Sequence, residues 1–299
     1  MKKLTYILIT VCLLLLLLAG FIYMRIVSSP TKVAILSIEE GNVLIDRGQG
    51  WLRATDEIDL SINDKIKTED NSIASLILYE SAIISLEPNT EISIVDLAKK
   101  HIKLKQESGS TWNKLISLGG IEGLSIQTPT TVATVRGTAF EVNMDAILVG
   151  EGIVDVEFEG EKISVGKDEK VEFTGQGQFA KKQMIKSALT NADKEKLIKK
   201  MQRTVKMLQK IRELEIQKHR FIAGQLQKRY GIDEAKAREY LSRADLGEFD
   251  LEEIEKKSPI KMESAKKIKG ITSEIIAQNQ EIERTAKRKL SEIQEQQTK

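Results

Sequence analysis

Short runs of alternating hydrophobic and polar residues fill the chain between residues 33 and 158. Such period-2 runs are typical of strands with one buried face, and turn residues separate them at intervals of about 8–12 residues. The runs are Val33–Ile38, Asn42–Asp46, Ile73–Tyr79, Ala82–Leu86, Glu91–Val95, His101–Gln106 and Ile153–Phe158. The pattern predicts a mainly β domain over residues 32–178, built either as a sandwich of two sheets or as a β-solenoid.

Near Ala180 the hydrophobic spacing changes to every three or four residues, the period of an amphipathic helix. The pattern predicts an α-helical region over residues 181–299 that begins with Asn191 or Asp193 as N-cap. Two long stripes are separated by a short predicted helix, Asp233–Ala244. The two stripes either bury each other in a helical hairpin or coiled coil, or one of them binds a protein partner or a second copy of the chain. The first contains Leu197, Met201, Val205, Leu208, Ile211 and Leu214, continued by Phe221 or Ile222, Leu226 and Tyr230. The second contains Ile268, Ile271, Ile275, Ile282, Ala286, Leu290 and Ile293.

An uncharged segment precedes the β domain and runs from Leu4 to Met24. A helix of this length spans the roughly 30 Å hydrocarbon core of a bilayer. Its apolar core is longer than the roughly 7–15 residues of a cleaved signal peptide. We therefore expect a transmembrane signal anchor over residues 4–27, with residues 1–3 as a cytoplasmic stub. The rest of the chain would lie outside the cytoplasmic (inner) membrane, in the periplasm of a bacterium with two membranes.

The net charge of +2 conceals a strong asymmetry. Residues 1–180 carry 17 Lys and Arg against 25 Asp and Glu, a balance of −8, whereas residues 181–299 carry 29 against 19, a balance of +10. The change of sign coincides with the change of pattern and marks a predicted domain boundary. The basic tail could attract anionic lipid or cell-wall polymer, but a solvated helix face explains most of its charge without a ligand.

The stretch Thr128–Phe140, TPTTVATVRGTAF, places two β-branched runs on either side of Arg136-Gly137. β-Branched residues favour strands, and a glycine there permits a bulge or a positive φ. The stretch therefore predicts strand, kink, strand, with Pro129 at the start or edge of a strand. The Arg136 guanidinium pairs with carboxylates and backbone carbonyls or binds an anionic group. We interpret these residues as structural: Thr128, Pro129, Val135, Arg136, Gly137, Thr138 and Phe140.

This stretch resembles the signature of the FecR domain family, and other positions follow the family's order. They are Gly41, Val43, Arg47, Trp51, the run Asp64–Thr68, Ala74, Leu76, Leu78, Ile84, Leu86, Pro88, Asn89, Thr90, Gly109, Trp112, Gly152 and Val154. The resemblance implies an outer β domain of the kind found in inner-membrane regulators. In those proteins the outer domain meets a ligand-loaded receptor, and a cytoplasmic N-terminal segment controls a sigma factor. Because only Met1–Lys3 precede the apolar segment, we expect no direct control of transcription through the N-terminus.

The sequence offers little material for catalysis or ligand chemistry. His101 and His219 are the only histidines and Cys12 is the only cysteine, so a zinc site lacks ligands. We expect no catalytic, metal or cofactor-binding residue and no nucleic-acid partner, and we interpret Trp51 and Trp112 as core residues. The leading hypothesis is a membrane-anchored, extracytoplasmic, non-enzymatic interaction or scaffold protein. The alternative is an envelope signal-transduction regulator that acts through a separate membrane partner.

Overall fold

A computed structural model describes most of the chain after residue 32. The described residues are 33–79, 81–98, 100–115, 121–135, 137–174, 183–218, 234–246, 248 and 263–297. The predicted membrane anchor, residues 4–27, lies outside them, as do Arg136 and His219. None of the helices within the described part combines the length and apolarity that a membrane crossing requires.

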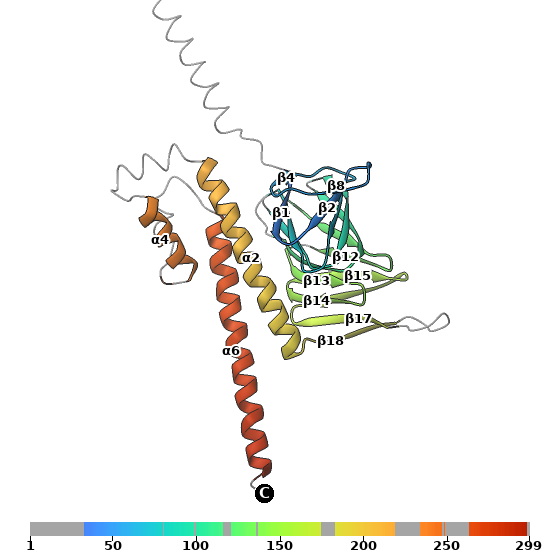
Figure 1. Cartoon of the computed structure of the whole chain (residues 1–299). Helices are drawn as coiled ribbons and strands as arrows, with labels where there is room; N and C mark the ends of the chain where they lie inside the picture. Colours follow the sequence, from blue (N-terminus) through green and yellow to red (C-terminus); the bar gives the residue numbers. More distant parts are fainter. Residues whose placement is uncertain are drawn as a thin grey trace, which may run out of the picture. The chain divides into compact units, whose positions relative to one another are not determined.

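The described β domain consists of two nine-stranded sheets (Figure 1). Sheet A, in spatial order, contains β18 (Gln183–Ala188), β17 (Glu169–Thr174), β14 (Ala146–Glu151), β13 (Ala139–Asn143), β10 (Ser110–Leu115), β7 (Ala82–Leu86), β6 (Ile73–Leu78), β1 (Ala34–Glu40) and β4 (Ile58–Asp59). Sheet B contains β16 (Glu161–Gly166), β15 (Ile153–Phe158), β12 (Thr131–Val135), β11 (Leu124–Gln127), β9 (His101–Ser108), β8 (Glu91–Ala98), β5 (Lys65–Thr68), β2 (Val43–Asp46) and β3 (Trp51–Arg53).

The chain advances along both sheets together, crossing from one sheet to the other after one or two strands. The described strand pairs are antiparallel except β9 with β11, which is parallel. Leu36 and Ile84 of sheet A share one buried core with Ile66 and Ile92 of sheet B. The predicted mainly β domain is therefore confirmed, and it takes the form of two packed sheets. The strand β18 lies beyond residue 178, the predicted end of this domain.

The C-terminal region contains the helices α2 (Asn191–Lys218), α4 (Glu234–Asp245) and α6 (Glu263–Gln297). Helix α2 lies between sheet A and α6, and one buried cluster holds side chains from all three (Figure 1). In that cluster, Leu197 and Leu208 of α2 meet Ile271 of α6 and Trp112 of sheet A. The two predicted stripes thus pack against each other over their described residues. Sheet A is an additional partner that the sequence pattern did not predict.

Helix α4 is held against α2 by a buried ion pair. The Arg212 guanidinium donates to both carboxylate oxygens of Asp245 at 2.5 and 2.9 Å, and the two side chains are only 7% and 6% exposed. The Gln209 amide donates a further hydrogen bond of 3.0 Å to Asp245. Such a bidentate pair fixes the position of α4 relative to α2. Because neither charge reaches solvent, removing one partner would leave the other buried without a compensating charge.

We expect Arg212→Leu to release α4 from α2, because it leaves the Asp245 carboxylate buried without its cation. Breaking a buried pair in this way costs about 3–5 kcal/mol. Hydrogen exchange of α4 amides should accelerate while the amides of β10 stay protected. The double variant Arg212→Leu/Asp245→Leu should recover most of the protection. Unchanged exchange of the α4 amides in Arg212→Leu would show that the position of α4 does not depend on this pair.

Candidate interaction site

The outer face of sheet A is apolar and receives the helical region. Along β10, β13 and β14 the side chains alternate between two buried clusters. Leu115, Phe140 and Val149 point into the core between the sheets, whereas Trp112 and Leu148 contribute to the cluster shared with the helices. Both faces of sheet A are therefore buried, as expected when helices cover a sheet that is already packed on its other side.

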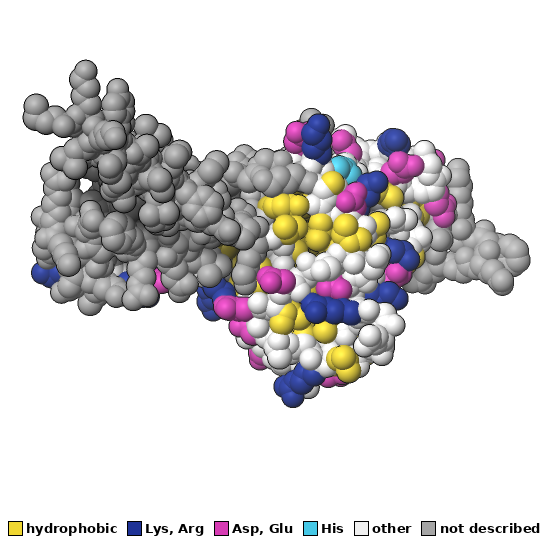
Figure 2. Space-filling view, turned by 90° about the horizontal axis from the view of Figure 1, so that it is seen from above, with side chains coloured by type: hydrophobic (Ala, Val, Ile, Leu, Met, Phe, Trp, Pro, Cys, Tyr) yellow, Lys and Arg dark blue, Asp and Glu magenta, His cyan; other side chains and the backbone are white. Residues whose placement is uncertain are grey.

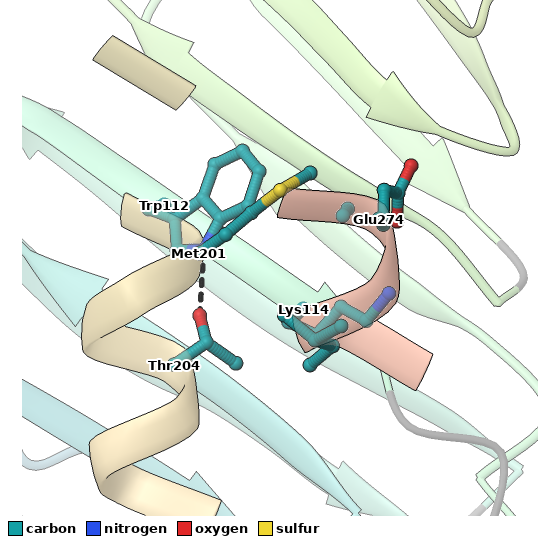
Figure 3. A pocket seen from close by; sticks show the side chains of 7 residues that line it. Trp112, Lys114, Met201, Thr204 and Glu274 are labelled. Atoms are coloured by element: carbon teal, nitrogen blue, oxygen red, sulfur yellow. Dashed lines mark hydrogen bonds between the residues drawn. The ribbon is translucent and has the colours of Figure 1, made fainter. Parts of the chain in front are cut away.

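Trp112 is the centre of this contact (Figure 3). The side chain is fully buried, and its indole Nε1 donates a hydrogen bond of 2.9 Å to Oγ1 of Thr204 on α2. Gly150 lies beside the ring, and its lack of a side chain lets α2 approach closely. A Cβ there would lie 3.4 Å from both Leu197 Cδ1 and Met201 Cε. The contact between sheet A and the helices around Trp112, which we call the seam, contains no cavity large enough for a water molecule. It is a packed interface, with no room for a ligand.

Basic side chains of α2 meet acidic side chains of the β domain around this apolar centre. Lys200 Nζ lies 2.6 Å from a carboxylate oxygen of Glu141, and both side chains are about nine-tenths buried. Arg203 pairs with Glu87 through both of its terminal nitrogens. Lys210 Nζ lies 3.3 Å from Asp56 and 3.1 Å from Glu57. Part of the basic excess of the tail is thus neutralised within the chain by the acidic β domain.

Helix α2 begins with a reciprocal capping box. The backbone N–H of Thr190 donates to Asp193 Oδ2 at 2.9 Å, and the backbone N–H of Asp193 donates to Thr190 Oγ1 at 3.2 Å. The N-cap is therefore Thr190, one residue before the predicted Asn191, and Asp193 is the third residue of the helix. Burial opposes ionisation of Asp193, but hydrogen bonds from Thr190 and the charge of Lys170 together lower the pKa of this carboxyl.

We expect the capping contribution of Asp193 to depend on pH. Because its folded pKa lies below the ordinary value of 3.8, the carboxylate stabilises the fold above that value, and the contribution disappears as the pH falls through the folded pKa. Asp193→Asn should lower the free energy of unfolding by about 1 kcal/mol near neutral pH, and the difference should shrink below about pH 4. Urea titrations at several pH values measure this. Thr190→Ala, which removes the hydroxyl acceptor, should keep most of its cost at low pH.

The outer face of sheet B is polar and is not covered by the described helices. We call it the open face. Cross-strand pairing aligns one row of its residues over seven neighbouring strands, and at about 4.8 Å per strand the row is roughly 29 Å long. No member of the row is buried. It consists of Lys65, Ser93, Lys105, Gln127, Val132, Glu157 and Lys162.

A shallow groove of about 380 Å³ occupies one end of the open face, where β12, β15 and β16 lie side by side. Val132, Thr134 and Glu157 line it together with Lys162. On its floor the Ser164 hydroxyl donates to Asp155 at 2.6 Å. Because the groove is wide, polar and open, it suits contact with another macromolecule better than enclosure of a small molecule. The open face is the candidate interaction site.

The signature stretch joins the two sheets. The strand β12 belongs to sheet B and β13 belongs to sheet A, so the predicted kink carries the chain from one sheet to the other. At this point Gly137 has a φ of +61°. Pro129 lies in the turn before β12 rather than at the first residue of a strand. The structure thus places the stretch as a connection within the scaffold, while the role of Arg136 stays a prediction.

The other signature residues fill the fold around this crossing. Val135 and Phe140 are core residues, and Thr128 Oγ1 accepts the backbone N–H of Thr131 at 3.0 Å in the β11–β12 turn. Thr138 is fully buried beside Gly152, whose φ is +79°. A Cβ at Gly152 would lie 2.6 Å from Thr138 Cγ2, so no larger residue fits without displacing the crossing.

The two tryptophans differ in their surroundings. Trp112 is buried, as predicted, but Trp51 is 37% exposed and the prediction of a core role for it is wrong. Trp51 lies on β3, a three-residue strand at the edge of sheet B, and Lys67 Nζ lies 5.9 Å from its ring centre. An edge strand has a neighbour on one side only, which explains why a large apolar side chain stays partly in solvent. Within the described residues there is no cluster of three metal-ligating side chains.

The central part of the β domain is similar to a known protein family. Residues 64–155 match the model of the FecR protein family. Two crystal structures of a proposed anti-sigma factor from Parabacteroides distasonis, at 2.50 and 1.65 Å resolution, each show 14% identity and a TM-score of 0.36. Each alignment covers 42% of this chain and 59% of the other, so this chain spans less than two thirds of the length of those structures. No curated protein matches the sequence. The part of this chain that matches the FecR family, residues 64–155, is set within a longer pair of sheets that begins at β1 and ends at β18.

Proposed function

We propose that this protein is held in the cytoplasmic membrane by one N-terminal span and that its extracytoplasmic FecR domain recognises another protein without catalysing a reaction. The observation that carries the proposal is the contrast between the two sheet faces. The apolar outer face of sheet A is occupied by the chain's own helices, whereas the open face of sheet B presents polar side chains over several strands.

Because of this contrast, we place the recognition surface on the β domain and no longer on the helical tail, where the sequence analysis placed it. The described stripes of α2 and α6 bury each other and cover Trp112, so they are not available to a second protein without opening the fold. Charged and polar side chains on a flat face favour specific and reversible association over permanent assembly.

Photo-crosslinking in cells tests the proposal. A photoreactive residue at Lys162 or Val132 probes the open face, and one at the exposed Gln202 of α2 serves as the control. We expect the two open-face positions to capture the same species, identified by mass spectrometry, and Gln202 to capture none. Capture from Gln202 alone would make the tail the recognition surface. Release of the protein from membranes by alkaline carbonate would contradict the proposed span.

The match to the FecR family favours one specific form of this function, a regulator that passes a signal through a separate membrane partner. In that case, deletion of the gene should change a defined set of transcripts under metal or envelope stress. Replacing Lys162 and Val132 together by Glu should reproduce the change if the open face transmits the signal. An unchanged transcriptome in the deletion strain would leave the scaffold form of the proposal.

A further inference from the structure

Three exposed aliphatic side chains lie close together where the described chain begins. Val33, Ile62 and Val95 are 41%, 49% and 47% exposed. Hydrogen bonds tie their segments to one another, because Leu60 donates to Ala34 O at 2.9 Å and Asn63 donates to Ile94 O at 2.8 Å. We call these three residues the Val33 patch.

Tyr79 closes the other side of the patch. Its backbone N–H donates to Val33 O at 2.8 Å, and its hydroxyl donates to Leu97 O at 2.6 Å, two residues after Val95. Figure 2, which looks down on the region of β1, β4 and β8, shows hydrophobic side chains gathered in the middle of the described β domain, with charged side chains around them. The patch is therefore a continuous feature of one end of the domain, in contrast to the scattered single hydrophobic residues that are normal on a surface.

Lysines dominate the close surroundings of Val95. Lys103 pairs in register with Asp96, the residue after Val95, and Lys65 pairs with Ser93, two residues before it. Lys100 lies in the turn that follows β8. All three lysines are exposed, and Asp96 is the acidic residue of this stretch of β8. Aliphatic side chains with lysines on one side, here the side of Val95, are the chemistry of a protein surface that rests on anionic lipid headgroups.

We infer that the Val33 patch rests on the outer surface of the membrane and inserts its aliphatic side chains between anionic lipid headgroups. The inference rests on the proposed membrane span, which ends at residue 27, six positions before Val33. Six residues reach at most about 20 Å even when fully extended, so the patch is tethered near the bilayer. Contact there would fix the orientation of the β domain, with the open face directed sideways to other envelope proteins.

Fluorescence quenching in vesicles tests this inference on the full-length protein. Cys12→Ala removes the single native thiol, and Ile62→Cys, Val95→Cys or Ile185→Cys then carries an environment-sensitive fluorophore. Ile185 is a matched control because it is 46% exposed and lies on β18, at the opposite end of sheet A from β1 and β4. The vesicles contain phosphatidylglycerol and phosphatidylcholine brominated near the headgroup.

We expect the fluorescence at Ile62 and Val95 to fall by at least about twofold relative to non-brominated vesicles, since interfacial side chains reach roughly 5–10 Å into the headgroup region. The Ile185 label should be unaffected. Equal fluorescence at the three positions, in protein that resists carbonate extraction, would overturn the inference and leave the span intact. Extraction by carbonate would overturn the span, and quenching confined to Ile62 and Val95 would then still support peripheral contact through the patch.

Discussion

Replacing Trp112 by Ala should lower the free energy of unfolding by about 3–5 kcal/mol, the usual cost of removing a fully buried aromatic side chain. The loss has two sources. The indole fills the seam between sheet A and α2, where there is no space for water to replace it. Its N–H also satisfies the Thr204 hydroxyl across the interface at 2.9 Å. Because single domains are stable by only about 5–15 kcal/mol, the variant should show a clearly lower urea midpoint.

The second tryptophan provides the control. Trp51 is 37% exposed on an edge strand, so Trp51→Ala should cost less than about 1 kcal/mol. Trp112→Phe separates packing from hydrogen bonding. It keeps most of the ring and loses the N–H, at a cost of about 1 kcal/mol, because the Thr204 hydroxyl can still donate to Lys200 O at 3.1 Å. Equal costs for Trp112→Ala and Trp51→Ala would show that the seam does not stabilise the protein.

The sequence predicted strands best where one face of a strand meets solvent. Ile153–Phe158 alternates strictly and is observed with those bounds as β15. The neighbouring strand β14, AILVGE, has no such alternation, because its first five residues are all buried. Sheet A is packed on both faces, so its central strands need not show a period-2 pattern, although the runs Ile73–Tyr79 and Ala82–Leu86 were recognised and are observed as β6 and β7. The helices were predicted from their period, and the short helix expected at Asp233–Ala244 is observed as α4, Glu234–Asp245.

The docking of the tail was not predicted, although one signal for it was present. The acidic balance of residues 1–180 and the basic balance of residues 181–299 indicated a boundary. The structure shows that these charges are also complementary, since Lys200 and Arg203 meet Glu141 and Glu87. The sequence places Glu87 after a strand and Arg203 in a helix, but it does not show that the two side chains are close. Contacts between elements far apart in the chain depend on the topology of the fold.

The largest effect is expected from removing the helical region. A chain that ends at Ala188 keeps every strand of both sheets but loses α2, α4 and α6. The outer face of sheet A would then expose the apolar residues of the shared cluster, including Ile77, Ile83 and Trp112. We expect this variant to aggregate or to bind a hydrophobic dye, because a patch of this kind rarely stays exposed on a soluble domain. Size-exclusion chromatography and dye fluorescence measure the two outcomes.

Two further variants distinguish the effect of uncovering sheet A from the effect of shortening the chain. A chain that ends at residue 262 keeps α2 over sheet A and should remain soluble with reduced stability, since only the face of α2 that meets α6 is uncovered. Co-expression of residues 189–299 as a separate polypeptide should restore solubility to the chain that ends at Ala188, because Lys200, Arg203 and Thr204 can still find their partners on sheet A. A soluble, monomeric chain ending at Ala188 with an unchanged unfolding transition would contradict this. The tail would then be a separable module, and the outer face of sheet A would be a second surface for recognition.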